Sequence, residues 1–270
     1  MVEITKKYKI GTRRFGLVNW YGTWTLYVKE VLRFLNVWAQ TLFSPLISSL
    51  LFLLVLSLAI GTERGEVLGV SFITFLAPGL IAMQIIQQAF SHSSSSLMIK
   101  KIDGTIVDLL FAPLSASEAT IAISLAAVTR SVLLAIISII TFILIIDIQI
   151  QNYLTLISFT FLSSFILGNI GIIAGLWAEK FDNMATVTNF IIVPLSFLSG
   201  TFYSIERLPG FLQTVSEFNP FFYMIDGFRY SFIGTADGSI TFGTTYLIIL
   251  SFISWLVAYI LYKKGYKIKS

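Results

Sequence analysis

The chain has 270 residues, of which 56% are hydrophobic and 12% are charged, and its formal net charge is +4. Soluble domains carry about 25% charged residues, so this composition excludes an ordinary water-soluble protein. The sequence contains no cysteine, which excludes disulfides, thiolate metal sites and cysteine nucleophiles.

Six uncharged apolar stretches are each long enough to cross a bilayer, whose hydrocarbon core of about 30 Å needs roughly 20 helical residues. Because unpaired backbone groups cannot face lipid, each stretch is predicted to be helical. They lie at 42–60, within 67–99, within 119–146, within 153–178, at 183–203 and at 242–262. The sequence therefore predicts an all-α polytopic membrane protein with six transmembrane helices, forming a single domain over residues 1–270.

The segment before the first span, residues 18–40, is predicted to be an amphipathic helix on the membrane surface. Its large apolar side chains recur three and four residues apart: Trp20, Trp24, Tyr27, Val31, Phe34, Leu35 and Trp38. Lys29, Glu30 and Arg33 interrupt that face. Tryptophan and tyrosine favour the headgroup layer, which suits an interfacial anchor. The alternative is that the aromatic residues stack on a glycan or another substrate.

Basic residues gather on one side of the predicted spans. They precede the first span, lie between the second and third and between the fourth and fifth, and follow the last; those nearest the N-terminus are Lys6, Lys7, Lys9, Arg13 and Arg14. The positive-inside rule therefore predicts that both termini are cytoplasmic. The isoelectric point near 9.2 follows from this topology. Without an aromatic–basic pattern for single strands, no nucleic-acid partner is expected.

The predicted cytoplasmic loop between the second and third spans, residues 98–117, contains a short amphipathic helix. Ile106, Leu109 and Leu110 share one face of this helix, and Pro113 is expected to end it. Ser117 is predicted to cap the next helix, with Glu118 at its positively polarised start. The residues alone leave two uses open for the short helix, which either binds a partner or re-enters the membrane interface.

Small residues mark close-packing faces in the second and fourth spans. In the fourth span these are Gly168, Gly171 and Gly175. In the second span a run of serines surrounds His92 near the predicted cytoplasmic end. This run either packs against neighbouring helices or lines a polar inner vestibule, which makes His92 a candidate pathway residue. As the single histidine, it cannot form a multi-histidine metal site.

Arg130 is the one ionised side chain well inside a predicted span, about 18 Å along the helix from Glu118. Such a charge must face protein or water, because it is costly in lipid. Two uses remain open. Arg130 either contacts an anionic headgroup or phosphate in the transport pathway, or pairs with carbonyls or an acid on a neighbouring span.

The connection between the fifth and sixth spans, residues 204–240, is long and unusual in composition. It is too apolar for a solvated loop, and its prolines and glycines interrupt it too often for a membrane span. Two short amphipathic helices at the outer interface, or dipping into it, are therefore predicted. Non-helical joints at that depth must be buried in protein or line a wet cavity.

Four stretches resemble the membrane subunit of ABC-2 type transporters, the permease family of bacterial drug, polysaccharide and teichoic-acid exporters. They are residues 75–80 (FLAPGL), 108–115 (DLLFAPLS), 181–183 (FDN) with 194–203 (PLSFLSGTFY), and 219–230 (NPFFYMIDGFRY). In order and spacing they cover nearly the whole chain. The chain looks most similar to the small permeases that pair with a separate ATPase, of the multidrug and lipid-linked export type.

The resemblance implies a role for each unusual segment. Residues 18–40 would form a connecting helix, residues 98–117 a coupling loop seated in a groove of the ATPase, and residues 204–240 re-entrant helices that close the outer mouth. The ATPase-coupling residues would be Lys100, Lys101, Asp103, Ile106, Asp108, Leu109, Leu110, Phe111 and Pro113. The outer gate would consist of Asn219, Pro220, Phe222, Asp226 and Arg229.

The resemblance also implies partners and a location. Two permease copies would pair as a homodimer in the bacterial inner membrane and bind two copies of a separate ATPase subunit. The sequence has no G-x-x-x-x-G-K-[ST] phosphate loop, so the chain is not expected to be an enzyme or to bind a cofactor. ATP and Mg²⁺ are expected on the partner subunit. Neither catalytic residues nor a metal site are expected.

The expected function is that of the transmembrane permease subunit of an ATP-binding cassette exporter. It would move an amphipathic drug, lipid or lipid-linked glycan out of the cytoplasm, in contact with membrane lipid. Two alternatives belong to other classes. An ion-coupled secondary transporter normally places acids within its spans, whereas the acids here cluster at loops and span ends. A channel needs only a polar path, which this composition allows.

Overall fold

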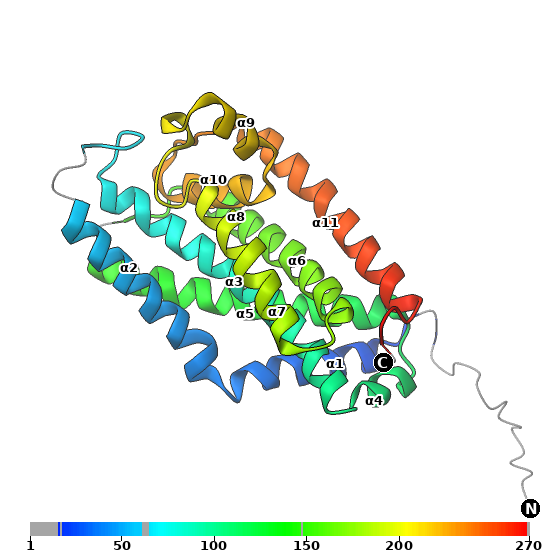
Figure 1. Cartoon of the computed structure of the whole chain (residues 1–270). Helices are drawn as coiled ribbons and strands as arrows, with labels where there is room; N and C mark the ends of the chain where they lie inside the picture. Colours follow the sequence, from blue (N-terminus) through cyan, green and yellow to red (C-terminus); the bar gives the residue numbers. More distant parts are fainter. Residues whose placement is uncertain (1–15, 17, 61–64, 147, 269–270) are drawn as a thin grey trace, which may run out of the picture.

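The computed structural model describes residues 16, 18–60, 65–146 and 148–268, and most of these belong to helices (Figure 1). The described part contains no β-strand; its one extended pairing is an isolated bridge between Val67 and Val70. The N-terminal basic residues Lys6, Lys7, Lys9, Arg13 and Arg14 lie outside the described ranges. The all-α fold class predicted from the sequence is therefore confirmed.

The helices follow one another with short connections. In chain order they are α1 (Trp20–Leu35), η1 (Ala39–Phe43), α2 (Ser44–Ile60), α3 (Phe72–Ile102), α4 (Ile106–Phe111), α5 (Ala116–Ile145), α6 (Tyr153–Trp177), α7 (Phe181–Val187), η2 (Thr188–Ile192), α8 (Val193–Leu198), η3 (Ile205–Arg207), α9 (Gly210–Phe218), α10 (Pro220–Ile233) and α11 (Ile240–Lys263). In Figure 1, α1 and α4 lie at one end of the bundle, and α9 and α10 lie at the other.

Six helical segments of the described chain are long and apolar enough to cross a membrane, as predicted. They are Ala39–Ala59, Phe72–Ile102, Ala116–Ile145, Tyr153–Trp177, Phe181–Leu198 and Ile240–Lys263. The first contains the π-helical turn η1 and the fifth contains η2. A proline lies just after each of these turns, at Pro45 and Pro194. Because proline has no backbone N–H, it interrupts the regular hydrogen-bond ladder at that point.

The central helix of the bundle is α3, which packs against α2, α5, α6 and α10. Its closest partner is α6, and glycines permit the approach. A Cβ atom on Gly171 would lie 2.5 Å from the carbonyl oxygen of Phe90, and one on Gly175 would lie 2.9 Å from that of Ser94. Gly171 and Gly175 of the predicted packing face therefore seat α6 on the serine-rich half of α3, whereas Gly168 packs against Ala127 of α5.

The start of α5 differs from the sequence-based prediction. Ser115, and not Ser117, is the N-cap. The Glu118 backbone N–H donates to Ser115 Oγ at 3.4 Å, and the Ser115 backbone N–H donates to Glu118 Oε2 at 2.7 Å. This reciprocal capping box needs a serine three residues before the glutamate, which Ser117 cannot provide. Glu118 Oε1 also accepts from the backbone N–H of Asn19, the N-cap of α1.

Candidate functional site

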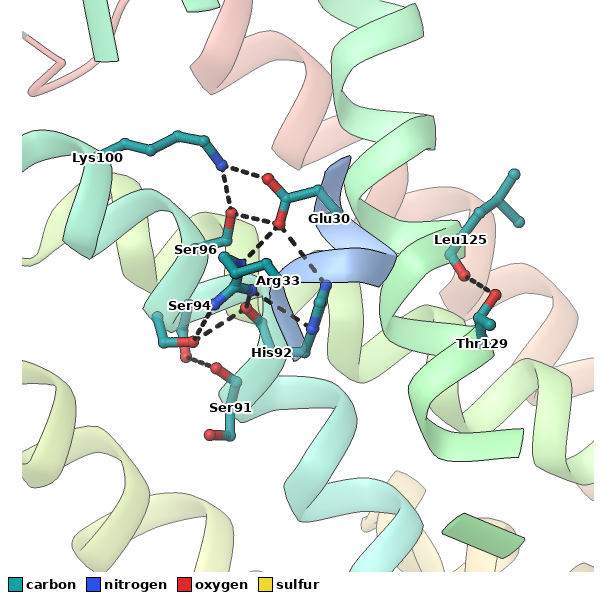
Figure 2. Close-up of polar contacts among 10 residues, drawn as sticks. Glu30, Arg33, Ser91, His92, Ser94, Ser96, Lys100, Leu125 and Thr129 are labelled. Atoms are coloured by element: carbon teal, nitrogen blue, oxygen red, sulfur yellow. Dashed lines mark hydrogen bonds and ion pairs between the residues drawn. The ribbon is translucent and has the colours of Figure 1, made fainter. Parts of the chain in front are cut away.

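A buried network of charged side chains joins α1 to α3 (Figure 2). Glu30 of α1 is only 1% exposed. Lys100 Nζ donates to Glu30 Oε1 and, at 2.7 Å, to Ser96 Oγ, while Ser96 Oγ donates to Glu30 Oε2 at 2.8 Å. Arg33 Nε reaches the same carboxylate oxygen at 3.1 Å. One carboxylate thus binds two cations, and these contacts fasten α1 to the serine-rich half of α3.

His92 lies inside this network and is fully buried. Arg33 Nη2 donates to the His92 backbone carbonyl at 2.8 Å and lies 3.4 Å from its Nδ1. The Nε2 atom is 3.8 Å from Glu30 Oε2, and the ring meets Phe34 edge-on at 5.6 Å between centroids. Among the two uses left open for His92, these contacts fit helix packing. A role in the transport pathway stays a prediction.

The Glu30 carboxylate has a displaced pKa. Burial raises the pKa, but the positive charges of Lys100 and Arg33 outweigh burial and bring the pKa of Glu30 from 4.5 down to about 2. A depressed pKa in the folded state stabilises the protein above the unfolded-state value, and this contribution is lost as the pH falls through the folded-state value.

This displacement predicts an acid-sensitive contact between α1 and α3. We expect the stability advantage of the natural chain over a Glu30→Gln variant to be complete at neutral pH and to shrink as the pH falls from 4.5 toward 2. Thermal unfolding of both proteins in detergent, measured over a pH series, checks this. A stability difference that does not change with pH would contradict the assignment.

Beside the network lies a cavity of about 630 Å³ between α1, α2, α3 and α8, with Arg130 of α5 at its wall. Its polar lining consists of Arg33, Gln40, Thr41, Ser44, Ser48, Gln84, Gln87, Gln88, Ser91, Ser95 and Arg130. Apolar side chains complete the wall, among them Val37, Phe52 and Phe197. His92 is not part of the lining; the neighbouring serines are. The cavity has the size of a small-molecule site.

Arg130 is 6% exposed and lies in the middle of α5. Its Nη2 atom donates to Gln88 Oε1 on α3, and its Nε atom has no hydrogen-bond partner within the described part of the chain. Within the described chain, Arg130 thus bonds to a neutral amide and not to an acid of a neighbouring span. A buried cation held by one neutral acceptor retains the capacity to bind an anion.

The apolar residues of the short helix α4 that are predicted to couple to an ATPase form two groups, one buried and one exposed. Ile106 and Leu109 are buried in an apolar cluster with residues of α1, α3, α5, α6 and α11. Leu110 and Phe111 are exposed, Phe111 by 85%, and the neighbouring Val107 is exposed as well. The helix ends at Phe111, just before Pro113, as predicted.

Of the four charged residues predicted for coupling, two bond within the protein and two are exposed. Lys100 belongs to the Glu30 network, and Lys101 Nζ donates to the carbonyl oxygens of Leu176, at 2.9 Å, and Ala178 at the end of α6. Asp103 and Asp108 are exposed on either side of the start of α4. The surface that α4 presents to solvent is therefore apolar and flanked by carboxylates.

At the opposite end of the bundle, α10 brings together the five residues predicted for the outer gate. Asn219 caps α10, and its Nδ2 atom donates to Ser199 Oγ at 2.7 Å. Pro220 occupies the first turn, and Phe222 is buried. The Asp226 carboxylate accepts hydrogen bonds from the backbone N–H groups of Asp237 and Gly238, at 3.0 and 2.9 Å.

Arg229 is only 1% exposed, and its side chain contacts residues of two other segments. Its Nε donates to the carbonyl of Phe75 at 3.2 Å, and its Nη2 donates to those of Gly200 and Thr201 at 2.6 and 3.3 Å. The guanidinium also lies 3.8 Å from the centroid of the Phe75 ring. These contacts tie α10 to the start of α3 and to the end of the fifth span.

Comparison with known proteins identifies the family of this fold. Residues 21–233 match the family described as ABC-2 type transporter. The chain belongs to the ABC-2 type transporter family. It is 31% identical over 253 residues to the inner membrane transport permease YadH of Escherichia coli K12, covering 93% of this chain and 98% of that protein. As a member of this family, it is a transport permease.

More distant relatives of the permease are nodulation proteins. Nodulation protein J of Neorhizobium galegae is 22% identical over 228 residues, covering 84% of this chain and 86% of the relative. Nodulation protein J of Rhizobium leguminosarum bv. trifolii is 24% identical over 222 residues, with 81% and 83% covered. The similarity to YadH and to these proteins extends over most of each chain.

The structure gives two residues of the permease contacts that the sequence does not predict. The sequence pattern marks Glu30 as an interruption of an interfacial face, whereas the structure buries Glu30 together with Leu26 and Phe34, each four residues away. That spacing signals a carboxylate on the inner face of α1. Gly79 passes against Arg229, because a Cβ there would lie 2.7 Å from Arg229 Nη2. No local sequence pattern predicts the contact between Gly79 and Arg229, because the two residues are far apart in the chain.

Proposed function

We propose that this permease is the transmembrane subunit of an ATP-driven exporter, which moves an amphipathic drug, lipid or lipid-linked glycan out of the cytoplasm. Membership of the ABC-2 family implies a partnership with an ATPase subunit. The observation that carries the proposal is the exposed apolar surface of α4, formed by Val107, Leu110 and Phe111. Large apolar side chains clustered on a short exposed helix are typical of a protein-binding surface.

The contacts around α4 suit a coupling element. Its buried side, Ile106 and Leu109, packs into a cluster shared by five other helices. The Glu30–Lys100 pair then fastens α1 to α3 a short distance away. A displacement of α4 would therefore be passed to α1, α3 and α5 together. The ATPase, closing on ATP and Mg²⁺, would supply that displacement.

We further propose the arrangement in the membrane. The end that carries α1 and α4 faces the cytoplasm of a bacterium, where both termini lie, and α9 and α10 form the outer re-entrant segment. Trp20, Tyr21 and Trp24 are exposed on α1, which supports an interfacial position for this helix. Two permeases would pair as a homodimer in the inner membrane and bind two ATPase subunits. The E. coli relative is named as an inner membrane transport permease, which supports this location.

Replacing Phe111 with alanine is expected to weaken ATPase binding by about 2 kcal/mol or more, because truncation of an exposed aromatic anchor removes a hot-spot contact. Co-purification of the ATPase with the tagged permease from its native membrane measures this. Phe218→Ala is the matched control, since Phe218 is a similarly exposed phenylalanine on α9 at the other end of the bundle. Equal ATPase recovery with both variants would refute the coupling surface.

A further inference from the structure

We propose that the cavity between α1, α2, α3 and α8 binds the anionic, phosphate-bearing headgroup of an amphiphile, with Arg33 and Arg130 as the recognising residues. This inference deepens the proposed function, because it narrows the transported substance to amphiphiles with a negatively charged head. The binding itself does not depend on an ATPase, so the two proposals can fail separately.

The charge around the cavity is the first argument. Arg33 and Arg130 line the cavity, and no aspartate or glutamate is among its described lining residues. The Glu30 carboxylate pairs with Arg33 at 3.1 Å and also binds Lys100. The single negative charge of Glu30 is therefore shared by two cations, Arg33 and Lys100, and Arg130 adds a third positive charge. Arg130 makes no ion pair within the described chain. A buried excess of positive charge is costly, and an anion in the cavity offsets it.

The hydrogen-bond donors are the second argument. A guanidinium carries five N–H donors in a planar fork that matches phosphate oxygens. Arg130 uses one of these groups on Gln88, and its buried Nε has no partner in the described chain. The side chain of Gln87 lines the same cavity and adds a neutral amide donor. A phosphate group offers several acceptor oxygens, so it suits this donor set better than a neutral or cationic ligand does.

The apolar part of the wall extends the proposal from an anion to an amphiphile. Val37 of the α1–η1 joint, Phe52 of α2 and Phe197 of α8 line the cavity and are partly open to the surroundings of the bundle. These helices belong to or adjoin predicted membrane spans. A volume of about 630 Å³ accommodates a headgroup and the start of its apolar tail.

Native mass spectrometry of the purified full-length chain tests the proposal with lysophosphatidic acid and lysophosphatidylcholine. These probes share an acyl chain and differ in headgroup charge. We expect lysophosphatidic acid to bind about tenfold more tightly, and Arg130→Gln to remove most of that preference. Gln87→Glu keeps Arg130 and places an acid in the cavity, so it should weaken lysophosphatidic acid binding similarly. Lys29→Gln is the matched control, because it removes an exposed charge one turn before Arg33.

Three results would overturn the proposal. The first is equal binding of the two probes, and the second is unchanged lysophosphatidic acid binding in both Arg130→Gln and Gln87→Glu. The third is displacement of lysophosphatidic acid by an equal concentration of inorganic phosphate, which would identify a free anion as the ligand. A chain that binds lysophosphatidic acid as expected but recruits no ATPase would retain this site and refute the proposed function alone.

Discussion

Replacing Arg229 with leucine is expected to destabilise the α10 end of the bundle by about 3 kcal/mol or more. The buried guanidinium donates to carbonyl oxygens of Phe75, Gly200 and Thr201. Its loss leaves these groups without their charged donor, and it also removes a positive charge that acts on the buried Asp226. Thermal unfolding in detergent should show a fall of several degrees, because a chain of this size loses about 2–4 °C for each kcal/mol.

The control for this experiment is Arg207→Leu. Arg207 lies at the same end of the bundle but is exposed, so its removal should change the unfolding temperature little. Equal effects of the two substitutions would show that Arg229 does not hold the segments together. Residues 75–80, 194–203 and 219–230, which are far apart in the chain, all meet at the Arg229 side chain.

Glu30→Gln is expected to produce a comparable loss at the other end, of about 3–5 kcal/mol. The substitution leaves Lys100, which is 8% exposed, as a buried charge without its carboxylate. Removing one partner of a buried pair costs more than removing both, because the remaining charge stays desolvated. The fall in unfolding temperature should therefore exceed that of any substitution at an exposed acid.

A double variant separates the pair from its individual members. Glu30→Gln with Lys100→Met should recover part of the stability that Glu30→Gln loses, since no buried ammonium remains. Glu179→Gln is the matched control, because Glu179 pairs with Lys267 at the surface and an exposed pair contributes little. If the double variant is as unstable as the sum of both single variants, the two residues do not interact as the structure indicates.

The fold was accessible from the sequence because the bilayer restricts the possibilities. A span must be helical, apolar and about 20 residues long, so charge-free windows locate helices before any packing is known. The predicted limits fall within a few residues of the helices observed. The small error at Ser117 arose because two serines lie close to Glu118, and only the spacing of Ser115 permits the reciprocal cap.

The side-chain contacts were less accessible, because they join residues far apart in the chain. A periodic pattern indicates that α4 has an apolar side, but it does not tell which apolar residues the protein itself covers. Ile106 and Leu109 pack inward, whereas Phe111 at the end of the same helix is exposed. The sequence predicts that Lys100 and Lys101 face a partner, yet Lys100 binds Glu30 and Lys101 binds the end of α6. Their role in coupling stays a prediction.

The central claim is that α4 of this permease contacts an ATPase, and site-specific cross-linking tests it most directly. The chain has no cysteine, so Phe111→Cys introduces a single thiol for a photoreactive cross-linker in the native membrane. We predict a product whose second chain contains the phosphate-binding G-x-x-x-x-G-K-[ST] loop, and no such product from Phe218→Cys. The absence of an ATPase product from position 111, under conditions in which the thiol is fully labelled, would contradict the account.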